Sequence, residues 1–153
     1  MKKIFRRFLG LIGLSLALTS HAAFALTAGQ QLSQEQIAKW GTLAEYDIGG
    51  SRIRVIPSQA SGSQDTLLIN AQGVVGSSRN EVAISDAPTQ DIRAQLKQTL
   101  PQPVSVQHYE PTGLTVLRYA DFEQAVAGLR ALKKALPAAN IRLPVQFGKQ
   151  VPY

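Results

Sequence analysis

Few side chains in this sequence could act chemically on a substrate. The chain has two histidines and no cysteine, and one histidine, His21, lies in a segment that we expect to be removed. The other, His108, would need a serine and an acid in register to form a Ser-His-Asp site, and the sequence has no Gly-x-Ser-x-Gly elbow. His108 is also in phase with Val104 and Val106 of an expected strand. This pattern favours a partly buried structural histidine.

Metal and cofactor sites are not indicated either. A metal needs several His, Cys or carboxylate ligands at fixed spacing, and the acids of this chain are scattered. Gly49-Gly50 is an isolated pair in an expected turn and does not make a glycine-rich phosphate loop. The lack of cysteine excludes disulfides and thiol catalysis. We therefore expect no enzyme, no catalytic residue, no metal and no cofactor, and a small hydrolase is the least favoured alternative.

Residues 1–25 have the parts of a signal peptide. A basic start is followed by an apolar stretch over residues 8–18, which is too short to span a bilayer as a helix. Ala23-Phe24-Ala25 fits the small-x-small cleavage pattern, so we place the mature start at Leu26. The alternative is a retained anchor helix. We expect a protein that is periplasmic, or secreted with a partner, and that has no membrane contact after cleavage. The basic residues at the start are Lys2, Lys3, Arg6 and Arg7.

Removing this segment changes the charge of the chain. The sequence has 16 Lys and Arg against 10 Asp and Glu, a formal charge of +6, and four of these bases but no acid lie in residues 1–25. Residues 26–153 therefore carry 12 bases against 10 acids, or +2. The one basic pair left, Lys133-Lys134, is typical of a solvated helix face. We expect no nucleic-acid binding, which needs a clustered basic surface, and one compact domain.

Residues 26–79 are expected to be an N-terminal extension packed on the main domain. Ser33 and Gln36 form a capping-box pattern at the start of a helix. Further along, charged and apolar residues alternate as in a half-buried strand, and two short apolar runs flank a hairpin turn. The expected helix, strand and hairpin lie in residues 33–43, 52–56 and 66–75, with loops at 58–65 and 76–80.

Residues 80–147 show a clearer order of elements. Four runs of β type and two amphipathic helical stripes follow one another as strand-helix-strand-strand-helix-strand, which is the split βαβ or ferredoxin-like plan. Asp86 is expected to cap the first helix, with Pro88 in its first turn, and Asp121 with Gln124 to cap the second. The expected strands are 82–84, 104–109, 114–119 and 141–147, and the expected helices lie within 86–100 and 121–136.

This order predicts an α+β fold, an antiparallel sheet with two helices on one face, plus an N-terminal helix/hairpin extension. Pro144 falls within the last expected strand, and proline is tolerated at a sheet edge, where the ferredoxin-like plan places its fourth strand. With both helices on one face, the other face of the sheet stays open. An uncovered face is typical of a partner site or a self-association surface. The sequence thus indicates a protein that works by binding another protein.

A small βαββαβ unit that runs into an extended tail resembles the propeptide of subtilisin-family serine proteases. Because no protease follows in this chain, it is most similar to a stand-alone version, the external chaperone of a secreted subtilase. The resemblance covers residues 81–153 and includes the tail Phe147-Gly148-Lys149-Gln150-Val151-Pro152-Tyr153. It implies a 1:1 complex in which the open sheet face packs on two surface helices of the protease and templates its folding.

The resemblance also implies a role for the tail, residues 148–153, in the active-site cleft of the protease. Tyr153 would fill the S1 subsite, Pro152 S2, Val151 S3 and Gln150 S4, and the tail would inhibit as a product does. Glu110 would cap a helix N-terminus of the protease. The alternatives are a disordered terminus for the tail and a solvated turn residue for Glu110. For the whole protein, the alternative is a periplasmic binding or assembly module unrelated to proteases.

Overall fold

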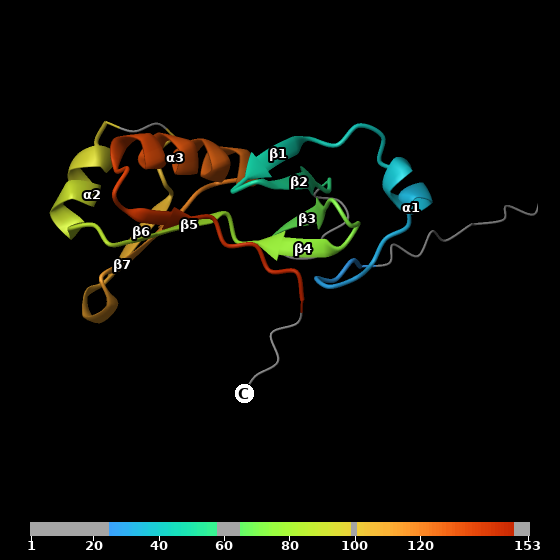
Figure 1. Ribbon diagram of the computed structural model, residues 1–153, viewed down its shortest axis with the longest axis horizontal. Helices are drawn as coiled ribbons and strands as arrows, with labels where there is room; N and C mark the ends of the chain where they lie inside the picture. The colour runs from blue at the N-terminus through green and yellow to red at the C-terminus, as the bar shows by residue number, and fades with distance from the viewer. Residues whose placement is uncertain (1–24, 58–64, 99–100, 149–153) are drawn as a thin grey trace, which may run out of the picture.

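The fold is α+β, as predicted, with two four-stranded antiparallel sheets that lie side by side along the long axis (Figure 1). The computed structural model describes residues 25–57, 65–98 and 101–148. The predicted signal peptide, apart from Ala25, and the tail residues Gln150 to Tyr153 lie outside these ranges. None of the described helices is long and apolar enough to cross a bilayer.

The first sheet is a simple meander in the N-terminal part of the chain. Each strand pairs with the next, so that the spatial order is β1-β2-β3-β4. A single turn of helix, α1 (Gln34–Ala38), precedes it and begins with the predicted capping box between Ser33 and Gln36. The strands are β1 (Glu45–Ile48), β2 (Ser51–Val55), β3 (Thr66–Asn70) and β4 (Val75–Ser78).

This sheet is larger than the helix/hairpin extension that the sequence predicted. Strand β1 was not expected, and Gly49-Gly50 forms its hairpin turn to β2, with both φ angles positive (61° and 81°). The Asp47 carboxylate holds that turn by accepting a hydrogen bond from the Gly50 N–H at 3.0 Å. Most of β4 lies in a stretch predicted to be a loop, because its glycine and serines have low β propensity and only their pairing with β3 makes them a strand.

The second sheet has the element order expected for residues 80–147. Its spatial order is β6-β7-β5-β8 with every neighbouring pair antiparallel, which is compatible with the ferredoxin-like plan. Both longer helices lie on the same face of this sheet, seen above it in Figure 1. The elements are β5 (Glu81–Ser85), α2 (Thr89–Leu96), β6 (Ser105–Tyr109), the 3₁₀ turn η2 (Glu110–Thr112), β7 (Leu114–Arg118), α3 (Phe122–Ala135) and β8 (Asn140–Arg142).

The two helices begin differently. For α3 the predicted cap is confirmed: the Asp121 carboxylate accepts from the Gln124 N–H at 2.8 Å and from the Gln124 side chain at 3.0 Å. For α2 the prediction was wrong, because Pro88 is the N-cap and no side chain caps the helix. Asp86 instead takes a left-handed conformation (φ 62°), and its carboxylate accepts from the Ser85 hydroxyl at 3.2 Å.

The main hydrophobic core spans both sheets. It contains the buried sides of β5 and β7, the inner faces of α2 and α3, and Ile53 and Leu68 from the N-terminal sheet. The other side of the N-terminal sheet packs on α1 in a second cluster, which includes Leu67 and Ile69. Strand β3 is therefore buried on both sides, and the N-terminal sheet shares a core with the second sheet and its helices.

The last described segment departs from the predicted strand. β8 ends at Arg142, just before Leu143-Pro144, and it lies at the sheet edge, where a proline can follow without breaking a ladder. The chain then leaves the second sheet and reaches the outer edge of β4, where Gln146 pairs with Ser77 (Figure 1). The predicted strand 141–147 is therefore wrong beyond Arg142. Ile141, Leu143 and Val145 still alternate toward the main core, whereas Phe147 is exposed and lies against β4.

Candidate functional site

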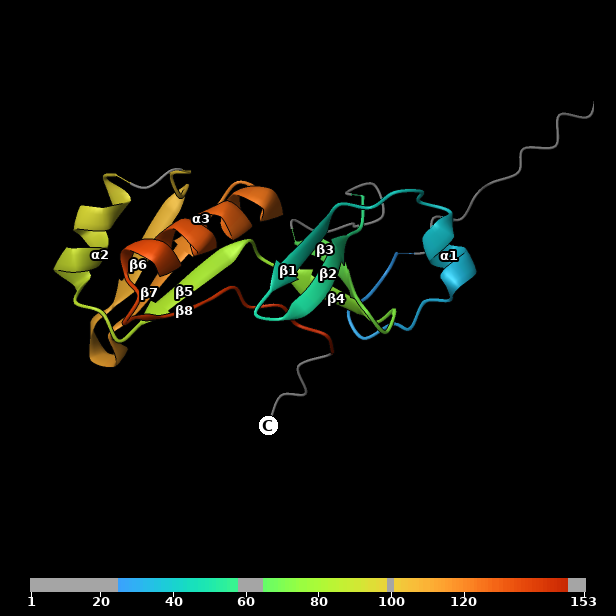
Figure 2. The ribbon, with the colours of Figure 1, turned by 45° about the horizontal axis from the view of Figure 1, so that its top comes forward.

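The face of the second sheet opposite the helices is the candidate binding site. Strand alternation places Val82 and Ile84 of β5 in the core, with no exposed surface, and turns Ala83 between them to the other side. The same alternation in β7 buries Thr115 and Leu117 and turns Val116 outward. In the described part of the chain, α2 and α3 lie on the core side and no helix covers the outward side (Figure 2). We call this outward side the open face.

Cross-strand register shows which open-face residues are neighbours. Ala83 lies directly opposite Val116 on one side and Arg142 on the other, and Val116 in turn lies opposite Gln107. These four residues form a row across all four strands, with an apolar centre and polar ends. A hollow of about 190 Å³ adjoins this row, lined by Ala83, Ser85, Leu114, Asn140 and Arg142. The centre of the face could therefore receive an apolar side chain of a partner.

The β6 side of the open face carries more exposed apolar surface. Tyr109, opposite Leu114, is 45% exposed, and its hydroxyl donates a 2.7 Å hydrogen bond to Oε1 of Gln107. Val104 and Val106, which are 63% and 40% exposed, share the strand phase of His108 and lie on the helix side of the β6 edge, not on the open face. An exposed aromatic group next to a few oriented polar groups is typical of protein interfaces.

Charge on the open face is sparse and slightly positive. Arg118 lies between Glu81 of β5 and Ser105 of β6, and Arg142 lies at the β8 edge. Two arginines against one glutamate favour a partner surface with acidic groups or unpaired carbonyl oxygens. Arginine is also the base most often used at interfaces, because its planar guanidinium can donate several hydrogen bonds at once.

His108 lies on the core side of the β6 strand and not on the open face. Its Nδ1 is 2.9 Å from the Thr115 hydroxyl, and the Arg93 Nε donates to its Nε2 at 3.4 Å. If Nε2 accepts, the neutral ring carries its proton on Nδ1 and donates to Thr115. No serine or acid completes a catalytic arrangement among the described partners of His108. His108 is thus partly buried and contacts Thr115 and Arg93, and its structural role stays a prediction.

Glu110 is placed as an exposed residue in the turn η2 between β6 and β7. It borders a surface hollow that Arg93 and Lys97 of α2 also line. The other predicted site residues, Gln150, Val151, Pro152 and Tyr153, lie outside the described residues. The roles of Glu110 and of the tail therefore stay predictions.

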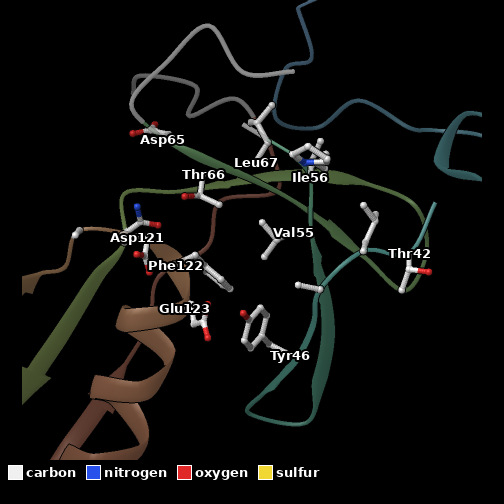
Figure 3. Close-up of a pocket in the computed structure, with 15 residues that line it drawn as sticks. Thr42, Tyr46, Val55, Ile56, Asp65, Thr66, Leu67, Asp121, Phe122 and Glu123 are labelled. Atoms are coloured by element: carbon white, nitrogen blue, oxygen red, sulfur yellow. The ribbon is translucent and has the colours of Figure 1, made fainter. Parts of the chain in front are cut away.

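A second concave site lies between the N-terminal sheet and the start of α3. This pocket has a volume of about 530 Å³, and Figure 3 shows Tyr46 and Val55 on one side of it and Phe122 and Glu123 on the other. Burial, with the carboxylates of Glu123 and Asp121, raises the pKa of Tyr46. The Oδ1 atom of Asn80, another lining residue, is buried without a hydrogen-bond partner.

The pocket is lined by hydroxyls and carboxylates. Its lining, as far as the structure describes it, contains two threonines and three acids and no histidine, lysine or arginine. Asp121 is engaged in capping α3, so it is not placed to act as a general base. Across the described ranges, no group of three or more His, Asp or Glu could hold a metal ion. We therefore take the open face, and not this pocket, as the candidate functional site.

The sequence predicted the open face as a whole but not its members. The sequence of β5, Glu81-Val82-Ala83-Ile84-Ser85, does indicate one of these members. The small Ala83 alternates with two β-branched core residues, which places it on the opposite face of the strand. The link between Gln146 and the first sheet had no comparable signal in the sequence.

Comparison with models of protein families, with curated proteins and with solved structures found no match.

Proposed function

We propose that this protein is an exported, non-catalytic chaperone and inhibitor of a subtilisin-type serine protease. The observation that carries the proposal is the open face, an uncovered antiparallel sheet with apolar residues at its centre and edge. The element order of that sheet is compatible with the propeptide that the sequence resembles. Two contacts make up the proposed complex: the open face binds the protease surface, and the C-terminal tail binds its cleft.

The open face would act as a folding template. The central pair Ala83 and Val116 and the hollow beside them offer a shallow apolar surface on which two partner helices can pack. Arg118 and Arg142 would meet acidic groups or carbonyl oxygens of those helices. Because the sheet is preformed by its own core, the partner gains ordered contacts without an ordering cost on the chaperone side.

The tail would supply inhibition. Gln150, Val151, Pro152 and Tyr153 would add to the cleft as an extended strand, with Tyr153 in S1. Proline has a fixed φ that suits an extended chain, and β-branched valine favours the same conformation. An aromatic side chain in S1 suits a subtilisin with an aromatic preference.

Refolding of a subtilase tests both roles. Subtilisin-type catalytic domains of the source organism, each produced without a propeptide, are denatured and diluted into buffer with an equimolar amount of this protein. Active sites are then titrated with an irreversible sulfonyl fluoride after the complex is dissociated. A parallel series uses the chain ending at Lys149, which lacks the four cleft-binding residues but keeps the open face.

The proposal predicts that both chains raise the yield of active protease and that only the full chain inhibits strongly. The loss of several cleft hydrogen bonds, each worth about 1 kcal/mol, would weaken inhibition at least about tenfold. If no subtilase gains activity with either chain, the proposal is wrong. Specific, saturable binding of a different envelope protein to the open face would then support the non-protease binding module.

A further inference from the structure

The segment after β8 is hydrogen-bonded to the N-terminal sheet, although Leu143 and Val145 within it still pack on the main core. The Ser77 N–H donates to the Gln146 carbonyl and the Gln146 N–H donates to the Ser77 carbonyl, both at 2.9 Å. This reciprocal pair adds Gln146 to the outer edge of β4. In both ribbon views the segment passes along β4 after it leaves β8 (Figures 1 and 2).

The next residue, Phe147, packs its ring against β4. A Cβ added at Gly76 would lie 2.7 Å from both Cδ1 and Cε1 of Phe147 and 3.1 Å from the Gln146 carbonyl oxygen. Only a residue without a Cβ leaves room for the Phe147 ring at position 76. The φ angle of Gly76 is not positive, so the backbone conformation alone does not require glycine there. Phe147 is still 36% exposed. We call the contact of Gly76 and Ser77 with Gln146 and Phe147 the clasp.

We propose that the clasp positions the C-terminal tail for inhibition, which makes the N-terminal sheet part of the inhibitory site. This inference rests on the proposed function and names the residues that set where the tail starts. Without the clasp, the tail would begin at the end of β8, at the edge of the second sheet. With it, the tail begins at β4, on the neighbouring sheet.

The clasp limits where the protease cleft can lie. Three extended residues span at most about 11 Å, so a closed clasp at Phe147 limits how far from β4 a tail bound in the cleft could begin. The cleft must therefore come close to β4 in the complex. Residues 26–79 would then lie beside the protease, and the clasp would raise the effective concentration of the tail at the cleft.

The competing explanation is that the clasp only protects the β4 edge from unwanted pairing. The two explanations differ in one respect. An edge cover affects stability or solubility, whereas a positioning contact also changes inhibition by a tail whose sequence is untouched. Variants must therefore open the clasp without altering the open face or the residues from Gln150 onward.

Gly76→Val and Ala127→Val form a pair for this test. The first places a branched side chain against the Phe147 ring, whereas the second adds the same side chain at an exposed position of α3, away from the clasp, the tail and the open face. Phe147→Ala is a second clasp variant, which removes the ring and adds no bulk to β4. All three are made in the full chain. Amide hydrogen exchange at Ser77 and Gln146 reports clasp opening in the protein alone.

We expect faster exchange at Ser77 and Gln146 in Gly76→Val and Phe147→Ala, with inhibition weakened by about tenfold or more. The yield of refolded protease should not change, because the open face is intact. Ala127→Val should match the wild type in both measurements. Faster exchange with unchanged inhibition in either clasp variant would overturn the proposal and leave only an edge cover.

Failure of the proposed function would look different. In that case the wild-type chain itself would inhibit no subtilase, while the exchange data would still report whether the clasp opens. If Gly76→Val does not fold, Phe147→Ala alone decides the outcome.

Discussion

The rings of Tyr46 and Phe122 meet edge to face, with centroids 5.7 Å apart and planes at 75°. Tyr46 belongs to β1 of the first sheet, and Phe122 is the first residue of α3 on the second. Phe122 is only 2% exposed, so this contact joins the N-terminal sheet to the main core. It is one reason why residues 26–79 are part of the same folding unit.

A double-mutant cycle with Tyr46→Leu and Phe122→Leu measures this contact. Edge-to-face pairs contribute about 0.5–1.5 kcal/mol beyond their buried area, so we expect a coupling free energy of that size in urea unfolding. Additive effects of the two substitutions would show that the two sheets are not coupled through these rings.

Gly128→Ala should destabilise the protein even though alanine favours helix over glycine. A Cβ at Gly128 would overlap the Tyr119 phenol, whose Cε1 atom would be 2.8 Å away. Overpacking of this kind costs about 1–3 kcal/mol, which exceeds the gain of about 1 kcal/mol in helix propensity. Thermal unfolding of Gly128→Ala, alone and with Tyr119→Leu, checks this. A rise in Tm for the single variant would contradict the close packing.

Stability should fall at alkaline pH because of Tyr119. Burial raises the pKa of Tyr119 from 10.0 to about 12, and its hydroxyl is buried without a hydrogen-bond partner. The folded state therefore keeps a proton that the unfolded state loses above pH 10, and stability from this group is lost as pH rises from about 10 to about 12. The size is of order 3 kcal/mol, since one pKa unit is worth about 1.4 kcal/mol.

Tyr119→Phe isolates this effect from the other titrating groups. The variant should lose part of the alkaline decline, and at neutral pH it should be about as stable as the wild type, because it removes an unpaired polar group. Unfolding free energies of both proteins are measured from pH 8 to pH 11.5. Parallel pH curves would show that Tyr119 ionises equally in both states.

His108→Gln tests whether the histidine has any chemical role. It should lower stability by about 1 kcal/mol through the altered contacts with Thr115 and Arg93, and leave refolding and inhibition of a subtilase unchanged. A variant with wild-type stability that lost an activity would instead favour the small-hydrolase alternative.

The second sheet was predictable because local patterns agree with each other there. The alternation in β5 and β7 and the Asp121 cap all indicate the same elements. Residues 26–79 gave weaker signals. β1 has only four residues, and Gly76-Ser77-Ser78 resembles a loop until β3 pairs with it and Phe147 covers it. Such strands are specified by tertiary contact and not by propensity.

The candidate site was predictable to the same extent. Two helices in a βαββαβ order leave one sheet face open, so its existence followed from the pattern. Which residues meet on it followed only from register, as with Ala83 between Val116 and Arg142. The clasp could not be predicted, because Gln146 pairs with a residue 69 positions earlier, Ser77, in another sheet.

The open face is tested most directly by a matched pair of alanine variants, Ala83→Glu and Ala127→Glu. Ala83 lies at the centre of the open face, whereas Ala127 is exposed on α3. Both substitutions add the same charge, and Arg142 opposite Ala83 can pair with the new carboxylate, so the free protein should tolerate it. Binding to the refolding subtilase domain is measured by calorimetry, with urea unfolding as the check on stability.

We expect Ala83→Glu to weaken binding about a hundredfold, because a carboxylate would be buried against the partner at a cost of about 3 kcal/mol. Ala127→Glu should stay within about twofold of the wild type, as surface substitutions do. Equal, tight binding by both stable variants would contradict the open face as the binding surface.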